Sequence, residues 1–426
     1  MAFLPHARRW RVLAVLVAWL LLPPRSGALQ IATGHAEPGR QICLDWTRKD
    51  GKNAELAYTR NNLGIPDRAQ NRMEDARKEY EDTLKTYREL ARKDPETYLP
   101  YVAATLSDLG ILDSDQNRME EAQKEYEESL KLYRELAQKD PATYLPNVAA
   151  TLNNLGILDR DKNRMEEALK TYRELAQKDP ATYLPYVAVT RNNLGNLDSD
   201  QNRMEDARKE YEEALKIYRE LAQKDPETYL PYVATMLNNL GILDSAQNRM
   251  KKAHKEQEEA LKTFRELAQK NPETYLPYVA ATLNNVGMLD RDQSRIEEAL
   301  KTYRELAQKD PQTFLPEVAL TLNNLGILDS AQNRMKEARN EYEEALKTYR
   351  ELAQKNPETY LPDVAMTLNN LGILDRDQNR MAEARKEYEE ALKIYEALCG
   401  TRSGTVHDRC QAAEETPEGV TEVSCR

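Results

Sequence analysis

The sequence predicts an all-α chain of stacked helical repeats, an α-solenoid, and two observations support that prediction. The first is the phrase NNLGILD, which recurs with variations around eight glycines, at Gly64, Gly110, Gly156, Gly195, Gly241, Gly287, Gly326 and Gly372. The second is the spacing of these glycines, which is 46, 46, 39, 46, 46, 39 and 46 residues. Units that recur at such a period cannot bury their apolar faces alone, so each one packs on its neighbours.

The two spacings differ by seven residues, which is nearly two turns of an α-helix. Comparison of Arg118–Leu136 with Arg164–Leu175 places the missing residues in the middle of one helix. A loss of seven residues leaves the following side chains only about 20° out of phase, so the apolar stripe stays aligned. The spacings also form a cycle of 131 residues, which indicates growth by copying three repeats at a time.

Each repeat is expected to contain two helices. Around Gly156 the first helix is predicted at Pro146–Leu158 and the second at Met165–Lys178. In the longer copies the second helix is predicted at Met119–Lys139, and Asp140-Pro141 ends it and turns the chain. Apolar residues at spacings of three and four predict the buried stripe of this helix, namely Met119, Ala122, Tyr126, Leu130, Tyr133 and Ala137.

One copy of the repeat carries a family pattern at Leu152, Leu155, Gly156, Ala168, Tyr172 and Pro180. These residues have the spacing of the tetratricopeptide repeat (TPR). The chain resembles this family over about residues 54–398, and it is most similar to long-helix members such as kinesin light chains. The resemblance implies a right-handed superhelix of eight helix-turn-helix repeats. It also implies a scaffold that binds a protein or peptide partner, of unknown identity, in a concave groove.

A row of amides marks the expected groove. The position two residues before each glycine points away from the second helix, and it carries Asn62, Asn154, Asn193, Asn239, Asn285, Asn324 and Asn370, with Asp108 as the exception. The row resembles the asparagine ladder of O-GlcNAc transferases, where amides bracket the backbone of an extended peptide. An amide matches a peptide unit because it has both donors and an acceptor. The alternative is that these asparagines are tolerated exposed polar residues, copied with the rest of the repeat.

Apolar and acidic positions accompany the amides. Ile242, Met288 and Ile327 follow their glycines directly and are expected to contact the peptide. Acidic residues five positions after the glycines favour a neutral-to-basic peptide, and they include Asp200, Asp292 and Asp377.

Aspartate occupies the third position after every glycine, and an arginine follows it five residues later, as in Asp113 and Arg118. We interpret this aspartate as a cap of the second helix or as a partner of the arginine. Asp113, Asp115 and Asn117 have the opening spacing of a calcium loop, but Arg118 stands where that loop needs glycine. The sequence therefore predicts no metal site and no cofactor.

Composition restricts the function further. A net charge of −11 disfavours binding to nucleic acid. The four histidines lie outside any nucleophile motif or phosphate-binding loop, so we do not expect an enzyme. The alternative to a binding scaffold is a structural spacer, or an array that self-associates through its uncapped C-terminal repeat.

The two ends of the chain differ from the array. Residues 1–28 resemble a secretory signal, with three arginines before the apolar run Val12–Leu22, which is too short for a stable membrane span. Export or secretion is therefore expected, and the alternative is a membrane anchor made by an uncleaved signal. A linker at 29–53, the array at 54–398 and a cysteine-containing tail at 399–426 follow. The simplest expected disulfide in the tail joins Cys410 and Cys425.

Overall fold

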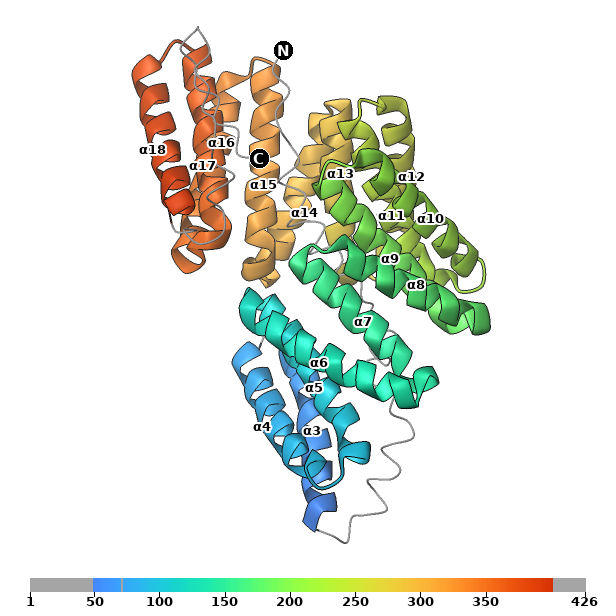
Figure 1. Ribbon diagram of the computed structural model, residues 1–426. Helices are drawn as coiled ribbons and strands as arrows, with labels where there is room; N and C mark the ends of the chain where they lie inside the picture. Colours follow the sequence, from blue (N-terminus) through green and yellow to red (C-terminus); the bar gives the residue numbers. More distant parts are fainter. Residues whose placement is uncertain (1–48, 70–71, 401–426) are drawn as a thin grey trace. The chain divides into compact units, whose positions relative to one another are not determined.

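The structure is a computed structural model that describes residues 49–69 and 72–400, and 91% of these residues are helical. The described part contains sixteen α-helices and no strand (Figure 1). The helices of the N-terminal half are α3 (Lys49–Ala69), α4 (Met73–Ala91), α5 (Pro95–Asp115), α6 (Met119–Lys139), α7 (Pro141–Asp159), α8 (Lys162–Lys178), α9 (Pro180–Asp200), α10 (Met204–Ala222) and α11 (Pro226–Ala246). Those of the C-terminal half are α12 (Met250–Lys270), α13 (Pro272–Asp290), α14 (Gln293–Lys309), α15 (Pro311–Ala331), α16 (Met335–Lys355), α17 (Pro357–Asp377) and α18 (Met381–Gly400).

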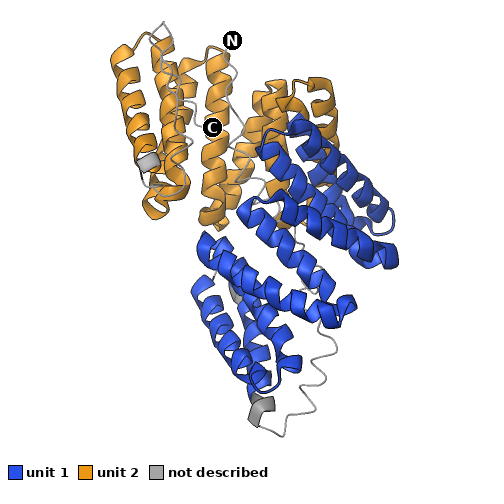
Figure 2. Ribbon diagram, viewed as in Figure 1, with its two compact units in different colours: residues 1–243 blue, residues 244–426 orange. Residues whose placement is uncertain are grey.

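The chain divides into two compact units, residues 1–243 and 244–426, and the boundary falls inside α11 (Figure 2). Within each unit a helix packs on the helices before and after it, and the first helices of some successive repeats also touch. This one-dimensional pattern of contacts is that of an α-solenoid and confirms the predicted fold class. The predicted signal at 1–28 and the Cys410–Cys425 disulfide lie outside the described residues, so both stay predictions.

The first helix of each repeat starts earlier than the sequence analysis predicted. In α7 the helix begins at Pro141 rather than Pro146, because Asp140 accepts a hydrogen bond from the Thr143 backbone N–H at 3.2 Å. Proline suits the first helical position, where its missing N–H has no intrahelical role. Pro146 then lies inside the helix and leaves only a carbonyl of the exposed first turn without its usual donor.

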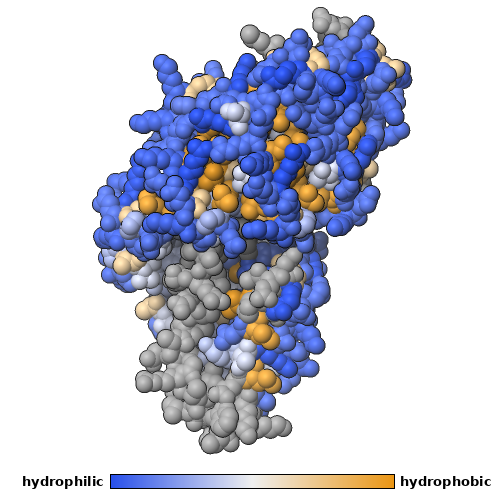
Figure 3. Space-filling view, turned by 180° about the vertical axis from the view of Figure 1, so that it is seen from behind, coloured by the Kyte–Doolittle hydropathy of each residue, from blue (hydrophilic) through white to orange (hydrophobic). Residues whose placement is uncertain are grey.

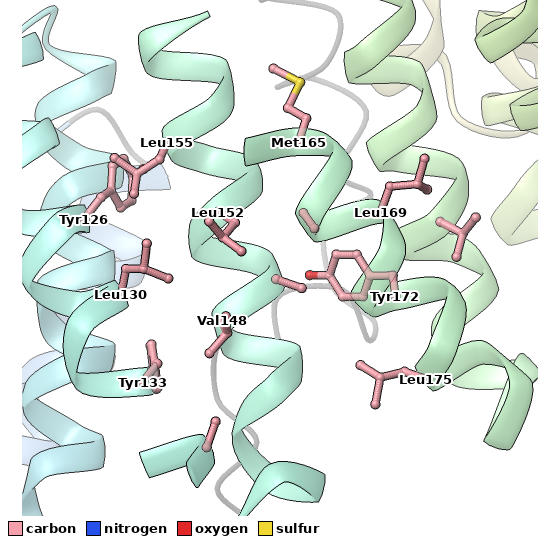
Figure 4. Packing of buried hydrophobic residues seen from close by; sticks show 14 of the residues in the cluster. Tyr126, Leu130, Tyr133, Val148, Leu152, Leu155, Met165, Leu169, Tyr172 and Leu175 are labelled. Carbon is pink, nitrogen blue, oxygen red and sulfur yellow. The ribbon is translucent and has the colours of Figure 1, made fainter. Parts of the chain in front are cut away.

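First and second helices alternate along the array, and each inner helix buries apolar side chains against the helices on both sides. Figure 4 shows α7 between its neighbours, with Leu152 and Leu155 facing a layer that includes Tyr126 of α6 and Tyr172 of α8. The predicted stripe of α6 is buried except for Met119, whose exposed fraction is 45%. Met119 is the first residue after the corner that joins α5 to α6, so the stripe begins one turn later, at Ala122.

Aromatic rings connect one repeat to the next in both units. The ring centroids of Tyr172 and Tyr186 lie 5.2 Å apart in a stacked pair, and Phe264 stacks on Tyr278 at the same distance. Each pair joins the second helix of one repeat to the first helix of the next. Such a contact contributes about 0.5–1.5 kcal/mol beyond the area that it buries.

The short repeats lose their seven residues at the corner between the helices, not in the middle of the second helix as predicted. Compared with α5 and α6, α7 is two residues shorter and α8 four residues shorter. The connection has two residues instead of three, and its left-handed residue is Arg160 instead of Asn117. The register of the remaining helix is preserved, because Met165 faces Gly156 where Tyr126 faces Gly110.

The repeat glycines allow the two helices of a repeat to approach closely. A Cβ atom added to Gly110 would lie 2.8 Å from two ring carbons of Tyr126, which is too close for a real contact. We predict that Gly110→Ala destabilises α5 and α6 by about 1–3 kcal/mol through overpacking, which exceeds the helix-propensity gain of about 1 kcal/mol. Hydrogen exchange of amides in these helices measures that local opening free energy.

A double-mutant cycle provides the control for this prediction. In a Tyr126→Ala background the ring is gone, so Gly110→Ala is expected to be neutral or stabilising. An equal loss in both backgrounds would show that contact with the ring is not the reason for the glycine.

Candidate peptide-binding face

The predicted amides lie where the first helices of successive repeats meet. Asn193 donates a hydrogen bond from Nδ2 to Oδ1 of Asn153 at 3.2 Å, and Asn324 donates in the same way to Asn284 at 3.3 Å. Bonds of the same kind also join Asn239 to Asn192 and Asn370 to Asn323. Each bond connects the amide two residues before a glycine to the amide three residues before the preceding glycine.

This arrangement corrects the expectation that all these amides are exposed. Asn193 and Asn370 are buried, whereas Asn154, Asn239, Asn285 and Asn324 are half-buried and Asn62 is exposed. A single helix viewed alone places the row on a free face, but the neighbouring first helix covers part of it. One N–H of Asn324 is used by its bond to Asn284, and its amide oxygen and second N–H are left for a ligand.

An aliphatic row lies beside the amides in each unit. Ile242, Met288 and Ile327 are half-buried, and Ile157 has 44% of its surface exposed. The face of the molecule shown in Figure 3 is mostly hydrophilic where it is coloured, with apolar residues gathered in patches. The aliphatic row therefore provides apolar contact area without a continuous apolar surface.

The acidic residues of this face already have basic neighbours. Asp200 lies 2.8 Å from Nη1 of Arg160, and Asp377 lies 3.0 Å from Nη2 of Arg376. Asp292 accepts from the Ser294 backbone N–H and lies 3.3 Å from Nε of Arg295. These pairs reduce the negative charge that the sequence analysis assigned to the face, because each carboxylate is locally neutralised.

The recurring aspartate at the corner has a structural role in the long repeats. Asp113, Asp198, Asp244, Asp329 and Asp375 are buried, and each accepts a hydrogen bond from the arginine five residues later. This confirms the interpretation of the aspartate as a partner of that arginine. In the short repeats the ion pair between the aspartate and the arginine is weaker. Asp159, for example, is exposed and lies 3.5 Å from Arg164. There Asp161 caps the second helix by accepting from the backbone N–H groups of Asn163 and Arg164.

Some corner aspartates also pair with a second basic residue, which comes from the preceding repeat and is not evident in the sequence of one repeat alone. The buried Asp113 also pairs with Arg77 of the preceding repeat, and Asp198 pairs with Lys162 at 2.9 Å. Each corner aspartate of this kind therefore connects two repeats. Burial at this corner also affects a nearby glutamate. Desolvation, partly offset by Arg77, raises the pKa of Glu125 to about 7.

None of the described helices has both the length and the apolar character needed to cross a bilayer.

Comparison with known proteins agrees with this architecture of stacked helical repeats. One model of the tetratricopeptide repeat matches residues 147–220 and 278–351, and another matches 56–95, 102–142, 233–272 and 364–404. The chain therefore belongs to the tetratricopeptide repeat family. This fold is typically that of a non-catalytic protein-interaction scaffold.

The solved structures to which the chain is similar have low sequence identity to it. The apo form of RapI is 14% identical with a TM-score of 0.50, and the match covers 70% of this chain and 99% of RapI. BtubC (BKLC) from P. vanneervenii is 21% identical with a TM-score of 0.35, covering 70% and 99% of the two chains. The apo quorum sensor NprR from B. thuringiensis is 16% identical with a TM-score of 0.42, covering 67% and 77%. No curated protein sequence matches the chain.

Asp108, the acid in the amide row, is expected to make the stability of the protein depend on pH. Burial raises the pKa of Asp108 to about 6 from 3.8, although Asn61 donates to its carboxylate at 3.1 Å and Arg68 lies nearby. The folded state then holds a proton that the unfolded state has released, so stability falls as pH rises from about 4 to about 6. Asp108→Asn removes this loss and restores the amide found in the other repeats.

We therefore expect Asp108→Asn to raise the free energy of unfolding at pH 7 by an amount on the order of 1 kcal/mol, and with it the melting temperature. The gain is expected to shrink toward pH 4, where the wild-type carboxyl is protonated. Thermal melts followed by circular dichroism across this range measure it. A difference that stays constant with pH would contradict the titration of Asp108.

Proposed function

We propose that the chain is a protein-interaction scaffold whose first helices bind an extended segment of a partner. The observation that carries the proposal is that two rows of side chains run side by side along the first helices. One row consists of half-buried aliphatic residues, and the other of amides with unused hydrogen-bonding groups. In the C-terminal unit this register is formed by Met288, Ile327 and Asn324. In the N-terminal unit it is formed by Ile242 and Asn239. The rows offer apolar contacts and backbone hydrogen bonds to any extended peptide.

The charges of this face make the proposed peptide close to neutral. Asp200, Asp292 and Asp377 each have an arginine neighbour, so a basic peptide gains less than an unpaired acidic row would give it. Net acidity elsewhere on the chain still disfavours strongly acidic partners.

Substitution of the aliphatic row tests the proposal without breaking the bonds between repeats. A peptide selected from a displayed random library is expected to bind about thirtyfold more weakly to Met288→Ser/Ile327→Ser, because each side chain contributes about 1 kcal/mol. Fluorescence anisotropy measures the change. Asn324→Ala is a poorer test, since it also removes the bond to Asn284.

Lys347→Ser on the exposed face of α16 is the matched control and is expected to leave the affinity unchanged. Both proteins should keep the wild-type melting temperature. Equal affinities of the double variant and the parent would place the peptide elsewhere.

A second candidate function is self-association through the C-terminal end. On α18, Leu392 has 47% of its surface exposed, whereas the equivalent Leu346 of α16 is covered by the next helix and has 7% exposed. Met381, Tyr388 and Leu392 line a shallow apolar depression on this helix. The exposed side chains are those that another first helix would cover.

A chain that ends at Leu398 is therefore expected to form oligomers as its concentration rises, and Leu392→Glu is expected to prevent this. Sedimentation velocity measures both. A truncated chain that remains monomeric at high concentration would exclude this candidate.

We also propose that the protein acts after export, because residues 1–28 have the composition of a cleaved signal. N-terminal sequencing of the mature chain is expected to begin at Leu29; a mature chain that retains residues 1–28 would contradict this.

A further inference from the structure

The second helix of the fifth repeat carries an imidazole where the other long repeats carry arginine or glutamine. Thirteen residues after their glycines these repeats have Arg77, Gln123, Arg208, Arg339 and Arg385, whereas α12 has His254. Arg77 and Arg339 reach the buried aspartate of the next repeat. The repeat after His254 is a short one, and its corner aspartate, Asp290, is exposed.

Three ligand-type side chains meet at this place within the C-terminal unit. Nδ1 of His254 lies 3.0 Å from Oδ1 of Asp290, which ends α13. Glu258 is one helical turn after His254, so both side chains lie on the same face of α12. One nitrogen or oxygen atom from each of the three residues lies within 4.8 Å of the other two.

We propose that His254, Glu258 and Asp290 form a site for a divalent transition-metal ion of the Zn²⁺ type. One imidazole and two carboxylates are ligands that Zn²⁺ accepts, at about 2.0–2.2 Å, with water completing the tetrahedron. Ligand atoms around such an ion lie roughly 3.4 Å apart, so side-chain movements of about 1 Å close the site. The side chains are partly exposed, which leaves access for the ion and its water.

The guanidinium of Arg295 lies among three carboxylates, those of Glu258, Asp290 and Asp292. Nη1 of Arg295 lies 2.5 Å from Glu258, and its Nε lies 3.3 Å from Asp292. Metal binding releases Glu258 from this guanidinium, which keeps Asp292 as its partner. Arg295 therefore competes with the ion, and Arg295→Gln is expected to increase the affinity for Zn²⁺.

The chain contains its own control 131 residues earlier, in the N-terminal unit. Gln123, Glu127, Asp159 and Arg164 occupy the positions of His254, Glu258, Asp290 and Arg295. There Arg164 lies 3.6 Å from Glu127 and 3.5 Å from Asp159, so the acids and the arginine also come together. The imidazole is the ligand that the earlier block lacks. His254→Gln therefore copies a side chain that the fold already accepts at this position.

Isothermal titration of the full chain with Zn²⁺ tests the proposal. The wild type is expected to bind one more equivalent than His254→Gln, and thiols in the tail affect both proteins equally. Gln123→His is expected to gain one further equivalent, because it completes the sister site. Unfolding midpoints measured without metal show whether the variants keep their fold.

A second readout uses the position of the site between two repeats. Zn²⁺ joins α12 to α13, so it is expected to slow hydrogen exchange at the ends of these helices in the wild type but not in His254→Gln. Equal stoichiometry and affinity for wild type and His254→Gln would overturn the proposal. A Gln123→His protein that gains no equivalent would overturn the assignment of the imidazole as the deciding ligand.

Discussion

The close approach of two helices at the repeat glycine is the constraint on which the rest of the structure depends. At Gly110 the first helix lies directly against the ring of Tyr126, and at Gly156 it lies against Met165. This contact sets the distance and register between the two helices of a repeat. With that register fixed, the stripe that begins at Ala122 faces the core. The long and short repeats then keep the same register between their two helices, although their corners differ by seven residues.

Contacts between neighbouring repeats turn this unit into an array. The Tyr172–Tyr186 stack, the Asn193–Asn153 amide bond and the Lys162–Asp198 ion pair all join one repeat to the next. Each of these contacts needs a side chain of the next repeat, so an isolated repeat lacks them. The same side chains that hold the array together border the face proposed for peptide binding. Substitution of an asparagine is therefore expected to change both stability and binding. Substitution in the aliphatic row is expected to change binding with less effect on stability.

The sequence was sufficient to predict the repeats, the solenoid and the bounds of α6, because the periodicity and the Asp-Pro stops are local signals. It misplaced the start of α7, since the cap made by Asp140 competes with the helix-starting preference of Pro146. It also treated the amides as a free face, because the neighbouring helix that covers Asn193 is not visible in one helix. His254 and Asp290 are 36 residues apart, and only the packing of α12 on α13 brings them together. Comparison of the 131-residue blocks could have singled out His254 as a departure.

Hydrogen exchange of the protein with and without a selected peptide tests the central claim most directly. Peptide binding to the first helices predicts slower exchange around Asn285–Met288 in α13 and Asn324–Ile327 in α15, the positions of the amide and aliphatic rows. The second helices α14 and α16 should exchange as in the free protein. Slower exchange confined to α14 and α16, or no change in any helix at saturating peptide, would contradict the proposed binding face.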